Sequence, residues 1–171
     1  VDDTTKDMVA GAAFHWYSGD HFEALDMVRQ NYPKLKLITS ESCIEYSKMN
    51  AVDDSGNAAK LAHEVIGDLN HGINAFYDWN LLLDETGGPN HVNNLCHAPF
   101  LYDRVDKTLC PQLLQRYFWH FSHTIMPGSV RIGLTRYTNT LEACAFRRPD
   151  GLLAVVLFNA GTKSIPVHLR L

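Results

Sequence analysis

A carboxylate at the end of a buried stretch is the first feature of this sequence that could do chemistry. Glu41 lies near the end of the apolar stretch Leu35–Cys43, which is typical of a strand. The period of two puts Leu37, Thr39 and Glu41 on one face. In a barrel of parallel strands the catalytic residues lie at the C-terminal ends, so Glu41 is suited to catalysis. On this residue alone, a solvated Glu at a strand end is the alternative.

Aromatic and polar side chains gather near the ends of the two neighbouring predicted strands. The run His15–Tyr17 (HWY) follows the first strand, and the run Asp78–Asn80 (DWN) lies within the third. Aromatic rings stack on pyranose rings, polar groups bind hydroxyls, and a carboxylate attacks or stabilises the anomeric carbon. Together with Glu41, these runs predict a sugar site. The aromatic residues could instead belong to the core, and the polar residues could only end a strand.

The elements that must position these residues alternate between strand and helix. Strands are predicted at Met8–Phe14, Leu35–Cys43 and Ile73–Leu83. The first intervening helix opens with the capping-box-like pair Asp20 and Glu23, and Gly72 ends the second. This alternation predicts three successive units of a parallel α/β sheet or barrel.

The second half of the chain changes character. The connection Asp84–Cys110 has no helical period and is long enough to shape a site, and a helix is predicted from Pro111 onward. Beyond Gly128, short alternating strands include a pair joined by the turn Pro149–Gly151 and a last strand at Ile165–Leu171. These strands predict a separate antiparallel β module.

Composition excludes several classes of partner. The formal net charge is −4 and the longest basic run is Arg147–Arg148, which disfavours nucleic acid. The longest mostly apolar runs are far shorter than the roughly 20 residues of a membrane helix, so no membrane span is expected. No targeting segment is visible, and the cellular location cannot be read from these residues.

Cysteine and histidine usage indicates neither a disulfide framework nor a metal centre. The 4 cysteines contain no CxxC pair, so free thiols are expected, although Cys96 and Cys110 could bridge the long connection. The 9 histidines fit no regular ligand spacing. We therefore expect no metal and no cofactor.

Four strings, in this order, resemble the C-terminal part of glycoside hydrolase family 30, the glucosylceramidase-like and β-1,6-glucanase-like retaining enzymes. They are VAGAAFHWY, LITSESC, YDWNLLLDETGGPNHVNN and HFSHTIMPGSVRIG. The resemblance implies a (β/α)8 barrel with an attached β-sandwich and a double-displacement mechanism. It makes Glu41, on the seventh strand, the catalytic nucleophile. It also implies a glycone pocket lined by His15, Trp16 and Tyr17 of the sixth strand, Trp79 of the eighth strand and Asn94 of the following loop.

One departure from the family pattern matters for function. The family takes its acid/base from an Asn-Glu pair at the end of the fourth strand, and this sequence contains no such pair. A barrel of this type takes ~250 residues. The chain is therefore expected to be a fragment that holds strands six to eight in residues 1–126 and an incomplete antiparallel β-sandwich in residues 127–171. The acid/base and the rest of the barrel would lie upstream of Val1.

Two functions from different classes follow from this resemblance. The first is a segment of a retaining β-glycoside hydrolase that carries the nucleophile. The second is a non-catalytic carbohydrate-binding or scaffold module derived from such an enzyme. Glu41 favours the first, because a binding module has no need of a carboxylate at the anomeric carbon. The substrate stays open between glucosylceramide-type β-glucosides and β-1,6-glucans.

Overall fold

The protein is described here by a computed structural model, which covers residues 4–46 and 54–170. The chain divides into two compact units, Val1–Phe118 and Trp119–Leu171. The division falls within helix α3 (Leu113–Thr124). The domain boundary expected between residues 126 and 127 stays a prediction.

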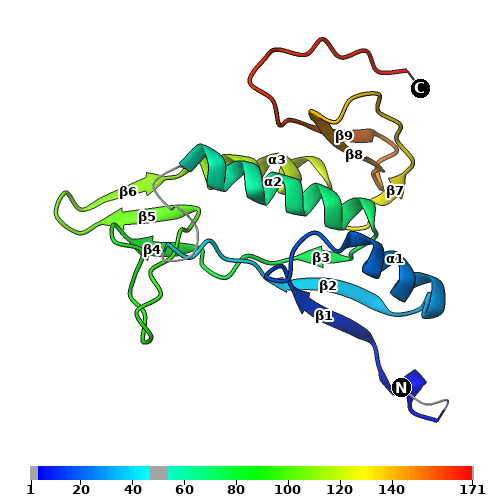
Figure 1. Ribbon diagram of the computed structural model, residues 1–171, viewed down its shortest axis with the longest axis horizontal. Coiled ribbons are helices and arrows are strands. Elements are labelled where there is room, and N and C mark those ends of the chain that lie inside the picture. The colour runs from blue at the N-terminus through cyan, green and yellow to red at the C-terminus, as the bar shows by residue number, and fades with distance from the viewer. Residues whose placement is uncertain (1–3, 47–53, 171) are drawn as a thin grey trace. The chain divides into compact units, whose positions relative to one another are not determined.

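The first unit is built on a parallel sheet. Its strands are β1 (Gly11–His15), β2 (Lys36–Glu41) and β3 (Ala75–Phe76), and they lie in the order β1-β2-β3. Both pairs are parallel, which confirms the predicted strand–helix alternation. The connecting helices α1 (Phe22–Asn31) and α2 (Asp54–Asn70) lie on the same side of the sheet (Figure 1).

Apolar side chains from the sheet and both helices form the core beneath those helices. Leu25, Leu37 and Ile73 are buried against one another, and α2 adds the buried Leu61, Val65 and Ile66. Burying each such side chain stabilises the fold by about 1.5–3 kcal/mol. The two helices approach closely at Gly67, where an added Cβ would lie 2.2 Å from Phe22 Cζ.

The first strand and the first helix begin later than predicted. Strand β1 starts at Gly11, because residues Lys6–Met8 form the short 3-10 helix η1. Helix α1 starts after His21, which caps it without a side-chain hydrogen bond. The predicted capping role of Asp20 is therefore wrong. Its carboxylate instead lies 3.0 Å from His63 Nε2 on α2.

The predicted strand Ile73–Leu83 is two strands in different sheets. Strand β3 ends at Phe76, and β4 (Leu82–Asp84) pairs in parallel with β5 (Phe100–Asp103). Strand β5 continues into an antiparallel hairpin with β6 (Thr108–Pro111), which the sequence did not predict. Because Pro111 belongs to this hairpin, α3 begins at Leu113 and not at Pro111.

The second unit contains an antiparallel sheet, as predicted. Its strands are β7 (Val130–Ile132), β8 (Leu141–Arg147) and β9 (Leu153–Asn159), in that order. The turn between β8 and β9 contains Gly151 at φ 84°, a conformation that glycine adopts without strain. The last predicted strand, Ile165–Leu171, is wrong over the described residues 165–170, because an alternating pattern forms a strand only where a partner strand accepts it.

Two further expectations concern cysteines and membranes. All four cysteines are free, so Cys96 and Cys110 form no bridge and the expectation of free thiols is confirmed. Cys144 is buried in β8, and burial raises the pKa of its thiol to about 12. Among the helices that the structure describes, none combines the length and the apolar character needed to cross a bilayer.

Candidate active site

Glu41 lies at an irregularity of β2. Strand β1 pairs Phe14 with Thr39 and then His15 with Glu41, so one step along β1 matches two steps along β2. Ser40 is the extra residue of a β-bulge, a feature that re-aims side chains next to active sites. The alternation that predicted one face for Leu37, Thr39 and Glu41 is therefore interrupted before Glu41.

The chain on the other side of β2 shows the same extra residue. The Tyr77 amide donates to the Thr39 carbonyl at 2.8 Å, and the Trp79 amide donates to the Ser42 carbonyl at 2.8 Å. In a regular parallel ladder the second bond would reach residue 41. On both sides of β2, therefore, the pairing skips one residue of the chain close to Glu41.

Two residues at and just after the end of β1 approach the Glu41 carboxylate. The Tyr17 hydroxyl donates to Oε1 at 2.9 Å, and His15 Nδ1 lies 3.8 Å from the same oxygen. The Glu41 side chain is 21% exposed. Burial raises the pKa of the Tyr17 phenol well above its usual range, and the hydrogen bond to Glu41 raises it further. Tyr17 is therefore a neutral donor at physiological pH.

Trp16 faces a cavity and does not contact Glu41 in the described contacts. Its indole Nε1 is buried without a hydrogen-bond partner among the described residues, and its ring packs edge-on against Tyr17 with centroids 6.4 Å apart. The cavity has a volume of about 270 Å³ and is also lined by Glu64 and Asp68 of α2, whereas Glu41 is not among its lining residues. Burial raises their pKa values, to about 7 for Glu64 and about 6 for Asp68.

Trp79 and its neighbour Asp78 lie beside the residue that follows Glu41. The Trp79 amide donates to the Ser42 carbonyl, and Trp79 as a whole residue is 63% exposed. The Ser42 hydroxyl donates to Asp78 Oδ1 at 2.9 Å. Burial raises the Asp78 pKa to about 6, although the Ser42 hydroxyl and the Trp79 amide oppose the shift. Sequence reasoning did not identify the Ser42–Asp78 pair, because the two residues are 36 positions apart.

Asn94 reaches this region through its backbone. Residues Glu45 and Cys96 form an antiparallel bridge, and the Tyr46 amide donates to the Leu95 carbonyl at 2.8 Å. The Cys96 thiol donates to the Asn94 carbonyl at 3.0 Å. The loop that carries Asn94 is thus tied to the chain that follows Glu41. The described contacts do not bring the Asn94 side chain to the Tyr17–Glu41 pair.

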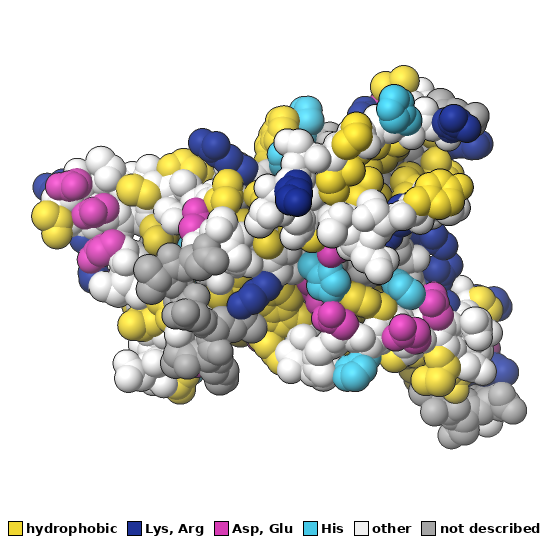
Figure 2. Space-filling view, turned by 45° about the horizontal axis from the view of Figure 1, so that its top comes forward, with side chains coloured by type: hydrophobic (Ala, Val, Ile, Leu, Met, Phe, Trp, Pro, Cys, Tyr) yellow, Lys and Arg dark blue, Asp and Glu magenta, His cyan; other side chains and the backbone are white. Residues whose placement is uncertain are grey.

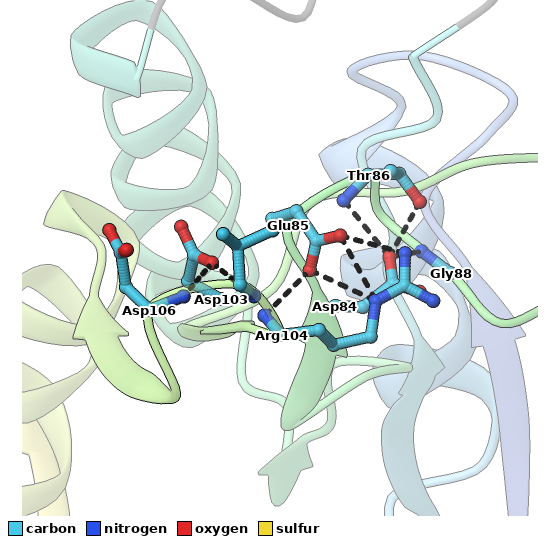
Figure 3. A network of polar contacts seen from close by, with 8 residues as sticks. Asp84, Glu85, Thr86, Gly88, Asp103, Arg104 and Asp106 are labelled. Atoms are coloured by element: carbon cyan, nitrogen blue, oxygen red, sulfur yellow. Dashed lines mark hydrogen bonds and ion pairs between the residues drawn. The ribbon is translucent and has the colours of Figure 1, made fainter.

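The beginning of that loop is held by a cluster of charged residues (Figure 3). Asp84 Oδ1 accepts hydrogen bonds from the amides of Thr86 and Gly88 and from the Thr86 hydroxyl. Arg104 of the β5–β6 hairpin binds both carboxylate oxygens of Glu85 and lies 3.3 Å from Asp84. These bonds lower the pKa of Asp84, and they lower that of Glu85 to about 2. Both carboxylates are therefore ionised at neutral pH.

A buried histidine joins three further segments near the site. His97 is 4% exposed, and its Nδ1 lies 3.0 Å from the Tyr46 hydroxyl. Its Nε2 lies 3.0 Å from Asp54 Oδ1, and Asp54 Oδ2 accepts the Leu113 amide. The network links the chain after β2 to the first turns of α2 and α3.

Histidine and acidic side chains also pair outside the site. His63 of α2 binds Asp20, which precedes α1, and His71, which follows α2, binds Asp26 of α1 at 2.7 Å. Figure 2 shows histidine and acidic side chains gathered over these helices. Within residues 4–46 and 54–170, no group of three or more His, Cys, Asp or Glu side chains has the arrangement of a metal site.

Comparisons with known proteins match both units. Residues 1–125 match the profile of the glycosyl hydrolase family 30 TIM-barrel domain, and residues 128–171 match that of the glycosyl hydrolase family 30 beta sandwich domain. The lysosomal acid glucosylceramidase of Mus musculus is 32% identical over 170 residues, which are 94% of this chain and 33% of that protein. The putative glucosylceramidase 3 of Caenorhabditis elegans is 33% identical over 126 residues, which are 71% of this chain and 24% of that protein.

Two solved structures are similar over most of the chain. SrfJ from Salmonella typhimurium superimposes with a TM-score of 0.83 and 36% identity, over 92% of this chain and 35% of SrfJ. The endo-β1,6-glucanase BT3312 superimposes with a TM-score of 0.82 and 32% identity, over 92% of this chain and 36% of BT3312. The chain spans about a third of the length of these relatives.

Proposed function

The chain belongs to glycosyl hydrolase family 30, and we propose that it is the nucleophile-bearing segment of a retaining β-glycoside hydrolase. The observation that carries this proposal is the hydrogen bond from the Tyr17 hydroxyl to Glu41 at the C-terminal end of a parallel strand. Glu41 is then the nucleophile. The residues proposed to line the glycone pocket are His15, Trp16, Tyr17, Trp79 and Asn94.

The contacts of Glu41 suit a carboxylate that forms a covalent bond. Tyr17 donates to Oε1 and so fixes the orientation of the whole carboxylate group. In the first step a carboxylate oxygen attacks the anomeric carbon, the bond to the leaving oxygen breaks, and that oxygen takes a proton from an acid. In the second step a water deprotonated by the same group displaces Glu41, and the sugar keeps its β configuration.

The acid/base belongs to another part of the protein. A retaining enzyme needs a second carboxyl group about 5–5.5 Å from the nucleophile. Asp78 is the main alternative carboxylate in this chain, but its Oδ1 already accepts a hydrogen bond from the Ser42 hydroxyl. We place the acid/base in the upstream half of the same barrel, which makes β1, β2 and β3 its sixth, seventh and eighth strands.

The substrate class is a β-glucoside or a β-glucan. Similar proteins include ones named glucosylceramidase and one named endo-β1,6-glucanase, and both names describe cleavage of β-glucosidic bonds. The Tyr17–Glu41 contact supports an enzyme over a carbohydrate-binding module, because binding alone needs no oriented carboxylate. Comparing kcat/KM for glucosylceramide and for a β-1,6-linked glucan in the complete protein separates the two substrates.

The test is a covalent trap in the complete protein. A 2-deoxy-2-fluoro glucoside with a good leaving group slows both displacements but lets the first proceed, so the glycosyl-enzyme accumulates. The added sugar mass is expected on the peptide containing Ile38–Ile44, and NMR should show a β product from the normal substrate. Glu41→Gln should remove the label and the activity, whereas Glu23→Gln, an exposed carboxylate on α1, should change neither. Label on Asp78, or an α product, would refute the assignment of Glu41.

A further inference from the structure

We propose that Asp78 is a positioning residue that fixes the bulge of β2 and thereby the direction of the Glu41 carboxylate. It acts through the Ser42 hydroxyl and through its neighbour, the Trp79 amide. This inference rests on the proposed function, because it assigns a role in setting the geometry of the nucleophile. It needs no contact between Asp78 and the sugar.

The register at the end of β2 is shifted by one residue. Residues 77–79 advance by two between the bond to Thr39 and the bond to Ser42, while the chain of β2 and the residue that follows it advances by three. A regular ladder would place the Trp79 amide on the Glu41 carbonyl. Moving the register by one residue turns a side chain to the other face of a sheet. The observed register therefore decides where the Glu41 side chain points.

Two hydrogen bonds hold this register. Ser42 is completely buried, and its hydroxyl lies 2.9 Å from Asp78 Oδ1 and 3.4 Å from the Tyr77 carbonyl. The shorter bond goes to a carboxylate, and hydrogen bonds to charged groups are about twice as strong as neutral ones. In the opposite direction, the Trp79 amide donates to the Ser42 carbonyl. Ser42 is thus bound through its side chain to Asp78 and through its backbone carbonyl to Trp79.

In the Ser42–Asp78 pair, Ser42 lies next to the candidate nucleophile in the sequence. A partly buried carboxylate opposes folding unless hydrogen bonds compensate for its lost hydration. Asp78 lies one residue before Trp79, and its partner Ser42 lies one residue after Glu41. The same carboxylate is close enough to Tyr17 and Cys43 to raise the pKa values of both. Asp78 therefore belongs to the immediate surroundings of the candidate nucleophile.

A matched control pair has its hydroxyl within β2 itself. The Thr39 hydroxyl donates to Asp68 Oδ2, and both residues are buried. This is also a hydroxyl–carboxylate pair anchored on β2, but it lies before the bulge and ties the strand to α2. Breaking it should lower stability without moving Glu41. A comparison of the two pairs separates positioning from packing.

The kinetic experiment uses the complete protein and the 2-deoxy-2-fluoro glucoside. Asp78→Leu and Ser42→Ala should each lower the rate constant of inactivation by roughly 10–100-fold, because small misplacements of a reacting group have effects of this size. The inhibitor concentration for half-maximal rate should change by less than about threefold, as expected when binding is kept. Asp78→Asn keeps an acceptor for Ser42 and should stay within about fivefold of wild type. Asp68→Leu should leave the rate constant of its folded fraction unchanged.

A structural readout tests the same inference without any sugar chemistry. In crystal structures of Ser42→Ala and Asp78→Leu, we expect the Trp79 amide to move from the Ser42 carbonyl to the Glu41 carbonyl. If Asp78→Leu does not fold, Ser42→Ala and Asp78→Asn still answer the question. An unchanged register together with a wild-type rate constant of inactivation would overturn the proposal. An equal decrease of this rate constant in Asp68→Leu and Asp78→Leu would also overturn it. A complete protein that is not inactivated at all would refute the proposed function, while the register of the variants would still be observable.

Discussion

At the scale of single residues, the direction of the Glu41 side chain follows from the β-bulge in β2. The period of two identifies the strand correctly, because Leu37 and Thr39 are buried as a shared face requires. That period stops at Ser40, and Glu41 then pairs with His15. Its carboxylate meets the Tyr17 hydroxyl as a result. A bulge of this kind lets one strand present apolar groups to helices and a reactive group at its end.

The first prediction concerns Tyr17. Removing its hydroxyl in Tyr17→Phe should lower the rate constant of covalent labelling in the complete protein by about tenfold. One hydrogen bond contributes about 1–1.5 kcal/mol, which is close to a factor of ten. The rate constant of labelling is measured from the time course of inactivation by the 2-deoxy-2-fluoro glucoside. The matched control is Tyr137→Phe, because Tyr137 is 98% exposed. A wild-type rate in Tyr17→Phe would mean that the hydroxyl does not orient Glu41.

At the scale of elements, the sequence predicted what local patterns determine. The parallel strands, the helices between them and the β8–β9 hairpin follow from apolar periodicity and turn residues. The division of Ile73–Leu83 could not be predicted, because Leu82–Asp84 leaves the first sheet to pair with the later strand β5. Asp20 matched a capping pattern, but its carboxylate contacts His63 of α2, a residue 43 positions away.

The candidate site was partly predictable for the same reason. The types and order of Glu41, Tyr17 and Trp79 predict a sugar site, since chemistry restricts which residues can serve there. The structure brings Tyr17 to Glu41, while the role of these residues stays a prediction. The hydrogen-bonded pairs around these residues could not be predicted. The Ser42–Asp78 pair, like the Arg104–Glu85 pair, joins residues far apart in the sequence and depends on how the strands come together.

The second prediction concerns α2 and its buried Glu64. Burial raises the Glu64 pKa, and the nearby Asp68 and Asp20 add to the shift, while His63 opposes it. Between pH 4.5 and about 7 the folded state binds more protons than the unfolded state, so the free energy of unfolding falls as pH rises through this window. The full shift corresponds to roughly 3 kcal/mol. Solvent in the adjoining cavity reduces this, and we expect about 1–2 kcal/mol.

Glu64→Gln removes this titration. At pH 8 the complete variant should be more stable than wild type by about 1–2 kcal/mol in urea unfolding, and the difference should vanish near pH 4. Glu23→Gln, at an exposed position of α1, should show no such pH dependence. A Glu64→Gln variant that loses stability at pH 8 would show that the carboxylate is favourably bound there.

At the scale of the whole molecule, the chain supplies only part of a barrel. The parallel sheet of the first unit has three strands, and β1 and β3 are its two edge strands. Unpaired edges and the cavity beside β1 are surfaces that further strands and helices of the same barrel would cover. The described strands supply Glu41 and its neighbours, while the proposed mechanism needs a second carboxyl group on the opposite side of the sugar.

The third prediction therefore concerns the isolated 171-residue chain. Attack by Glu41 on an unactivated β-glucoside expels an alkoxide, which is a poor leaving group unless an acid protonates it. Absence of the acid alone costs roughly 10²–10⁴-fold in rate, and the open sheet edges add to this loss. With an alkyl β-glucoside, whose alkoxide leaving group needs an acid, the isolated chain should show no turnover above that of its own Glu41→Gln variant, whereas the complete protein should hydrolyse the substrate. Circular dichroism should establish that both forms of the isolated chain are folded. Turnover by the isolated chain that Glu41→Gln abolishes would place an acid/base within these residues, and Asp78 would then be the first carboxylate to substitute.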